Sequence, residues 1–129
     1  MIAENELRWY GRSLSKKLKQ LRIIPFSDLH YGNPYCSLKH AERTLNIVSA
    51  NEDTFMVLNG DLLEAVTKLS KGDIYAQKIT PQEQRDKVIK LLKPLSSKIL
   101  GMTTGNHEMR IYRETGVDLS LDIARELNV

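Results

Sequence analysis

Residues 55–61, FMVLNGD, pass from an apolar run of strand length directly into a polar turn. Two other stretches repeat this order: residues 21–30 read LRIIPFSDLH, and residues 99–108 read ILGMTTGNHE. Apolar residues at helical spacing separate the three stretches. Strands that alternate with helices are typical of a parallel sheet with right-handed crossovers. The sequence therefore predicts an α/β fold built on a parallel βαβαβ unit.

Helices are predicted between and around these strands. Residues 1–20 are interpreted as an amphipathic lead-in, helical over 3–20, and residues 62–69 as a short helix. Capping signals mark another helix, because Thr80 can cap it, Pro81 suits its first position and Glu83 can complete a capping box. Two more helices are indicated by apolar residues that share one face: Leu38, Ala41, Leu45 and Val48 in one, and Leu119, Ile123 and Leu127 in the last.

Length and composition favour one soluble globular domain. The chain has 129 residues, of which 27% are charged and 41% hydrophobic, which is typical of a folded domain rather than a disordered chain. No apolar run approaches the ~20 residues that a membrane-spanning helix needs, and the charged first twenty residues do not resemble a secretory signal. A single cysteine, Cys36, cannot form an internal disulfide, which suits a reducing compartment. We therefore expect a cytoplasmic protein without a membrane partner.

The net charge of +3 permits an anionic partner, such as a phosphoester or a nucleic acid, without requiring one. Basic residues are concentrated between residues 8 and 22. A solvated helix face is the favoured interpretation of this cluster, and a nucleic-acid patch is the alternative.

Polar clusters follow all three predicted strands. The carboxyl ends of parallel strands lie along one edge of a sheet, where ligands bind, so convergence is expected for Asp28, His30, Asp61, Asn106 and His107. Asp28 and His30 are two residues apart and would point the same way on a strand; a carboxylate with an imidazole can chelate a divalent cation. Asp61 has two oxygens and can bridge two cations, Asn106 adds a neutral oxygen, and His107 remains available as a proton donor.

Three motifs thus follow the strands in order: Asp28-x-His30, Gly60-Asp61 and Gly105-Asn106-His107-Glu108. Together they resemble the calcineurin-like metallophosphoesterase superfamily, over residues 22–108. The resemblance implies one half of a four-layer α/β/β/α sandwich. It also implies that Asp28 and His30 bind one metal and that Asp61 bridges to a second. Asn106 would bind that second metal, and His107 would assist the leaving group or the phosphate.

The resemblance implies a metal-dependent hydrolase of phosphoesters, in which a metal-bridging hydroxide attacks phosphorus in line. Two divalent ions are implied; Mn²⁺ is expected, and Fe, Zn, Ni, Co and Mg are alternatives. Protein serine/threonine phosphatases of this superfamily carry an arginine in the second motif, whereas residues 60–65 here read GDLLEA. We therefore favour a phosphodiesterase or a nuclease.

The family also uses further histidines downstream, but this chain contains only His30, His40 and His107. We therefore interpret residues 1–129 as a single, incomplete metallophosphoesterase domain. A further chain segment, a partner or a second copy in a homo-oligomer would supply the missing ligands. The alternative is a non-catalytic or partner-completed metal-binding module that retains only half of the site.

Purely structural roles compete with these interpretations. Asp28 and His30 can form an ordinary strand-end turn, and Asp61 can cap a helix that begins at residue 62. His40 is expected on the surface, and Cys36 is expected to be a small buried or half-buried group rather than a ligand. Residues 68–78 are either a substrate-facing loop or a solvated connection.

Overall fold

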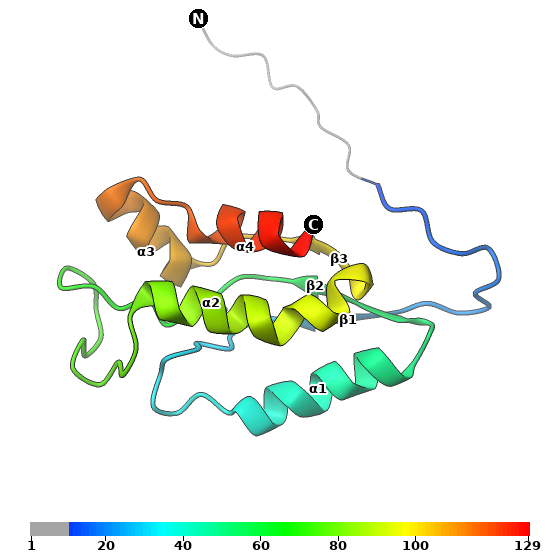
Figure 1. Cartoon of the computed structure of the whole chain (residues 1–129), viewed down its shortest axis with the longest axis horizontal. Helices are drawn as coiled ribbons and strands as arrows, with labels where there is room; N and C mark the ends of the chain where they lie inside the picture. Colours follow the sequence, from blue (N-terminus) through cyan, green and yellow to red (C-terminus); the bar gives the residue numbers. More distant parts are fainter. Residues whose placement is uncertain (1–10) are drawn as a thin grey trace, which may run out of the picture.

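The computed structural model describes residues 11–129, which form a three-stranded parallel sheet in the order β1-β2-β3 (Figure 1). The elements are β1 (Arg22–Phe26), α1 (Leu38–Ala50), β2 (Thr54–Leu58), α2 (Pro81–Leu92), the 3₁₀ helix η1 (Lys93–Lys98), β3 (Ile99–Met102), α3 (Asn106–Thr115) and α4 (Leu119–Leu127). The predicted parallel α/β arrangement is confirmed. The four-layer sandwich stays a prediction.

The strands lie where the apolar runs predict them. β1 is an edge strand that pairs with β2 along its whole length. Pro25, which lies opposite Val57, has no N–H to donate, and an edge strand tolerates this because only one of its sides is paired. β2 is the central strand, and its register with β3 shifts next to Val57.

The hydrophobic core lies between the sheet and helices α1, α2 and α4. α2 begins as predicted, because the Thr80 hydroxyl accepts the Glu83 N–H at 3.2 Å and the Glu83 carboxylate accepts the Thr80 N–H at 2.8 Å. α2 then packs against α4. The predicted apolar helix faces are buried, except that Leu38 is exposed: Ala41, Leu45 and Val48 in α1, and Leu119, Ile123 and Leu127 in α4.

The predicted lead-in helix is wrong wherever it can be compared. Residues 1–10 lie outside the described part of the chain, and residues 11–20 form no helix. Leu14 and Leu18, which would lie on the apolar face of such a helix, are only half-buried. An isolated helical turn is unfavourable without tertiary packing. The segment is instead attached by side chains, since Arg12 donates to the Ile99 carbonyl at 3.1 Å and Gln20 to Asp53.

The short helix predicted over residues 62–69 is also absent. The chain runs beside the segment that follows β1, where the Tyr31 N–H donates to the Leu62 carbonyl at 2.8 Å and the Glu64 N–H to the Tyr31 carbonyl at 3.0 Å. Residues 62–66 are all buried, so their backbone groups need partners, and the neighbouring segment provides some of them. Conversely, α3 was not predicted as a separate helix. No helix within residues 11–129 is long and apolar enough to cross a membrane.

Candidate metal centre

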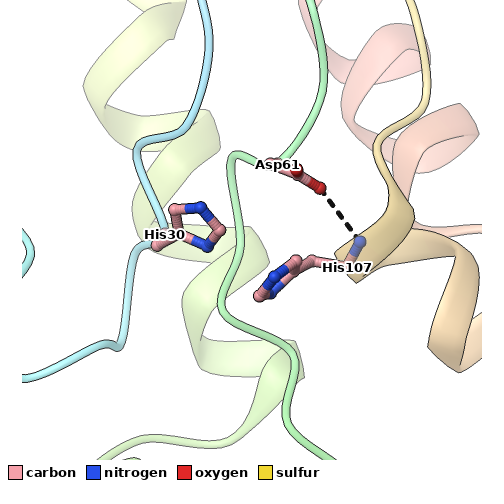
Figure 2. A group of neighbouring side chains, drawn as sticks. All are labelled: His30, Asp61 and His107. Atoms are coloured by element: carbon pink, nitrogen blue, oxygen red, sulfur yellow. Dashed lines mark hydrogen bonds between the residues drawn. The ribbon is translucent and has the colours of Figure 1, made fainter. Parts of the chain in front are cut away.

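The segments after β1 and β2 and the start of α3 bring His30, Asp61 and His107 together at the carboxyl edge of the sheet (Figure 2). Each of the three half-buried residues can offer one ligand atom, and these atoms lie within 4.8 Å of one another. The expected convergence is therefore present for these three residues. Their binding of a metal stays a prediction.

The two segments beyond β1 and β2 are held side by side in an unusual backbone conformation. The His30 N–H donates to the Asp61 carbonyl at 3.0 Å. Positive φ angles occur at Asp28 (54°), His30 (48°), Asp61 (51°) and Ala65 (46°). Such left-handed conformations cost about 1–3 kcal/mol each and cluster at functional sites. The prediction that Asp28 and His30 share one strand face is therefore wrong, because both lie beyond the end of β1.

Two glycines let the second and third motifs meet. A Cβ atom on Gly60 would lie 2.3 Å from the backbone nitrogen of Gly105, and a Cβ atom on Gly105 would lie 2.1 Å from the backbone nitrogen of Asp61. No side chain fits at these distances, so glycine is required at both positions. This close backbone approach joins the two motifs directly.

The side chains of Asp61 and Glu108 each accept backbone hydrogen bonds across this contact. The Asp61 Oδ1 atom accepts the His107 N–H at 2.9 Å, which caps the start of α3 from another loop. The buried Glu108 carboxylate accepts the N–H groups of Asp61 (3.0 Å) and Leu63 (2.9 Å). Within the described residues, the Asp61 Oδ2 atom has no hydrogen bond and is available to a cation. The proposed cap by Asp61 of a helix at residue 62 is wrong.

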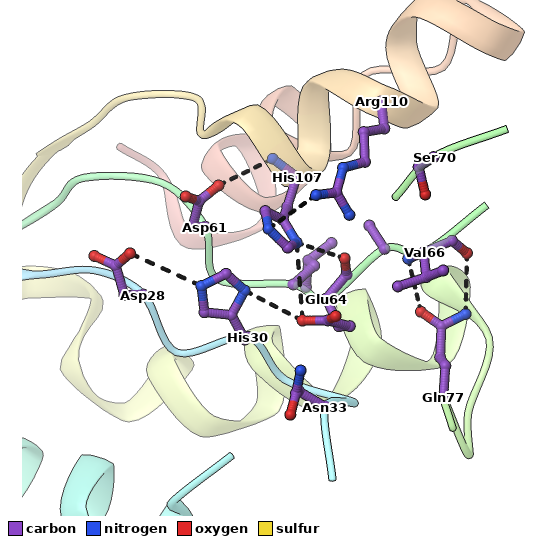
Figure 3. A network of polar contacts seen from close by, with 12 residues as sticks. Asp28, His30, Asn33, Asp61, Glu64, Val66, Ser70, Gln77, His107 and Arg110 are labelled. Carbon is purple, nitrogen blue, oxygen red and sulfur yellow. Dashed lines mark hydrogen bonds and ion pairs between the residues drawn. The ribbon is translucent and has the colours of Figure 1, made fainter. Parts of the chain in front are cut away.

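Glu64 links both imidazoles and was missed as a site residue (Figure 3). Its buried carboxylate lies 3.2 Å from His30 Nδ1 and 3.8 Å from His107 Nδ1, and its carbonyl lies 2.7 Å from His107 Nδ1. Metal-binding histidines commonly donate their second ring N–H to a carboxylate or a carbonyl, which directs the first nitrogen towards the metal. His107 has such a bond with the Glu64 carbonyl, whereas His30 Nδ1 lies beside the Glu64 carboxylate without an aligned hydrogen bond. A signal was present in the sequence: Glu64 is the one charged residue in the apolar run 62–66, LLEAV.

The loop that carries Glu64 is fastened to α2 by glutamines, which sequence reasoning also missed. Gln84 is fully buried, accepts the Ala65 N–H at 2.9 Å and donates to Gln77 at 2.8 Å. Gln77 in turn accepts the Val66 N–H at 2.9 Å. This network holds residues 64–66 in place although they belong to no helix or strand.

Asp28 and Asn106, the other two predicted ligands, are exposed. The Asp28 side chain is 70% exposed, with Oδ1 3.8 Å from His30 Nε2 and Oδ2 accepting the Ser27 hydroxyl at 2.5 Å. Asn106 is exposed at the first position of α3. Their roles as metal ligands stay predictions.

The structure agrees with the modest roles expected of His40 and Cys36. His40 is exposed on α1. Cys36 is half-buried, and burial raises the pKa of its thiol. A thiol with a raised pKa is a poor nucleophile and a poor metal ligand.

Arg110 adds a positive charge beside His107. Its Nη2 atom lies 3.1 Å from His107 Nε2. Within residues 11–129, no carboxylate lies within 4.0 Å of this guanidinium, and its Nη1 atom is buried without a hydrogen-bond partner. A guanidinium in this state favours an anion.

The donors suit a divalent transition metal, because two imidazoles and one carboxylate bind Mn, Fe or Zn and leave positions for water. No match to the chain was found among protein-family models, curated proteins or solved structures.

Proposed function

We propose that this chain forms the metal-binding part of a phosphoester hydrolase, of the phosphodiesterase or nuclease type, in the calcineurin-like metallophosphoesterase superfamily. The observation that carries the proposal is the group of His30, Asp61 and His107, whose ligand atoms lie within 4.8 Å of one another. The group lies at the edge of a parallel sheet where ligands bind. Its members come from the three motifs on which the resemblance rests.

Mn²⁺ is the ion we expect, with Fe, Zn, Ni, Co and Mg as alternatives. Bound at this group, a divalent ion would polarise a phosphoryl oxygen and lower the pKa of a water molecule. A second ion at Asp61 and Asn106 would need further donors, from another chain segment or a partner.

The chain's own residues would position the reactants. Glu64 lies against both imidazoles, and Asp61 offers one carboxylate oxygen to the same group. Since the Glu64 carbonyl can only accept a hydrogen bond, His107 Nδ1 carries the hydrogen, and Nε2 keeps its lone pair. In this structure the Nε2 lone pair faces the Arg110 Nη2 donor at 3.1 Å. A metal at Nε2 would therefore displace Arg110, and a ligand role for His107 would replace its predicted role in assisting the leaving group. Arg110 can pair with phosphoryl oxygens, because no carboxylate within residues 11–129 neutralises it.

A second candidate function is a non-catalytic or partner-completed metal-binding module. It is favoured by the exposed positions of Asp28 and Asn106, two of the predicted ligands. Both candidate functions require metal binding, but only the first requires that the chain hydrolyses a phosphoester.

Calorimetric titration with Mn²⁺ tests the shared requirement. We expect about one ion per chain and a rise in the unfolding temperature when Mn²⁺ is added. Removing even an outer-shell partner of a metal ligand typically costs 10–100-fold in affinity, so Asp61→Asn should cost about 100-fold or more. The fold should survive, because an asparagine oxygen can still accept the His107 N–H. Asp53→Asn is the matched control, since Asp53 precedes β2 and Asp61 follows it.

Absence of Mn²⁺ and Zn²⁺ binding, or equal binding by Asp61→Asn and the unmodified chain, contradicts both candidates. Hydrolysis of bis(p-nitrophenyl) phosphate then separates them. Metal-dependent turnover that Asp61→Asn abolishes supports the hydrolase, whereas tight metal binding without turnover supports the module.

A further inference from the structure

The cavity at the candidate metal centre is lined partly by residues that have no role in the proposed phosphoester hydrolysis. The cavity measures about 510 Å³ and is lined on one part by His30, Glu64 and His107, and on another by Asn33 and Tyr35. Its volume falls within the roughly 300–1,000 Å³ of sites for small organic ligands. It can therefore hold a group attached to the phosphoester as well as the phosphoester itself.

Tyr35 presents its side chain from a constrained loop but packs against almost nothing. Its N–H donates to the Asn33 Oδ1 atom at 2.8 Å, and the Cys36 N–H donates to the Asn33 carbonyl at 3.0 Å. Pro34 further restricts the backbone between them. Nevertheless Tyr35 is 94% exposed, so its ring contributes little to the hydrophobic core. The loop thus offers an aromatic surface at low conformational cost.

We propose that Tyr35 stacks on a nucleobase, so that the substrate of this site is a nucleotide or a nucleic-acid phosphodiester. This inference rests on the proposed function, which places the phosphoester at His30, Asp61 and His107. Stacking of a base on an aromatic side chain contributes about 1–3 kcal/mol and tolerates any base. The Asn33 Oδ1 atom is engaged by Tyr35, so the amide nitrogen of Asn33 is the donor left for the sugar or the base. A sugar phosphate or a phosphoserine peptide would leave the Tyr35 ring unused.

Tyr75 provides a matched control within the same chain. It is also 94% exposed. Its N–H donates to the Oδ1 atom of Asp73 at 2.8 Å, just as the Tyr35 N–H donates to the side chain two residues before it. However, Tyr75 is not among the residues that line the cavity of the metal centre. If loss of any exposed tyrosine weakens nucleotide binding, substitution of Tyr35 and of Tyr75 should both do so. If stacking is responsible, only substitution of Tyr35 should weaken it.

The experiment compares adenosine 5′-monophosphate with ribose 5-phosphate, which lacks the base, by titration into the Mn²⁺-loaded chain. The stacking free energy corresponds to a preference for the nucleotide of about 5- to 150-fold. Tyr35→Ala should remove this preference while Mn²⁺ affinity and ribose 5-phosphate affinity stay unchanged. Tyr35→Phe and Tyr75→Ala should retain it. In nuclear magnetic resonance spectra, the Tyr35 ring protons should shift upfield with the nucleotide and not with the sugar phosphate.

Equal affinity for the two ligands, or a preference that survives Tyr35→Ala, overturns the inference and leaves the proposed function intact, because the phosphate still binds. If Mn²⁺ binds but neither ligand does, the proposed function fails and the inference fails with it.

Discussion

The two ends of the parallel sheet both carry polar side chains, but in different states. At the amino end, Arg22 pairs with Asp53 at 2.9 Å, and Lys98 donates to the carbonyls of Asn51 and Glu52 at 3.0 Å each. None of these five residues has a positive φ angle. These groups are exposed or half-buried, and each has a hydrogen-bond partner.

At the carboxyl end, polar groups are buried, crowded and incompletely paired. Asp61 and Glu64 lie in the loop after β2, which pairs with the loop after β1, and the buried Glu108 carboxylate of α3 accepts two N–H groups of the first of these loops. His30 Nδ1 and Glu64 Oε2 lack a well-aligned hydrogen bond. Four residues with left-handed backbone conformations lie in the same loops. The comparison teaches that a polar cluster alone does not indicate a site. Burial, strain and unused donors and acceptors distinguish the end that suits a ligand.

The largest expected effect of a substitution at the carboxyl end is a loss of stability. Glu108→Ala should lower the free energy of unfolding by about 3 kcal/mol, because it leaves the N–H groups of Asp61 and Leu63 without their charged acceptor. Urea unfolding measures the change. Glu114→Ala is the control on the same helix, where the exposed carboxylate accepts only the Thr67 hydroxyl. Equal losses in the two variants would contradict the support that we assign to Glu108.

A smaller effect is expected at Glu64, and it should separate function from stability. Glu64→Gln should weaken Mn²⁺ binding about 10-fold or more, since the neutral amide orients and polarises His30 less well. Stability of the metal-free chain should be unchanged or higher, because a buried negative charge is removed. Titration calorimetry and urea unfolding measure the two quantities, with Glu114→Gln as the control. A variant that loses stability but keeps its affinity for Mn²⁺ would show that Glu64 is structural.

The smallest effect is expected at the amino end, as a dependence on pH. Hydrogen bonds from Arg22 and then Gln20 hold the pKa of Asp53 below its ordinary value. The carboxylate therefore contributes stability above the pKa of the unfolded chain, about 3.9, and this contribution is lost as the pH falls through the lower folded value. Asp53→Asn should flatten the decline in stability between pH 5 and 2 slightly. An unchanged acid profile would show that the pair with Arg22 contributes nothing.

Local signals in the sequence predicted much of the fold but only part of the site. The capping box at Thr80 and Glu83 depends on residues three apart, and the strands are continuous apolar runs. By contrast, the segment with Leu62 and Glu64 pairs with residues more than thirty positions away, so its helical pattern was misleading. The predicted His30 and Asp61 meet in the group of three, whereas Glu64 and Gln84 act through burial and tertiary contacts that no short motif encodes.

The cap on α3 has a consequence for the order of folding. The acceptor for the His107 N–H belongs to Asp61, forty-six residues earlier in the chain, and Gly105, the residue before the helix, supplies no side-chain cap. Starting a helix is its costly step. The first turn of α3 is therefore stabilised only after β2 and β3 have paired and their loops have met. Helix α3 should form late, at the same stage as the candidate metal centre itself.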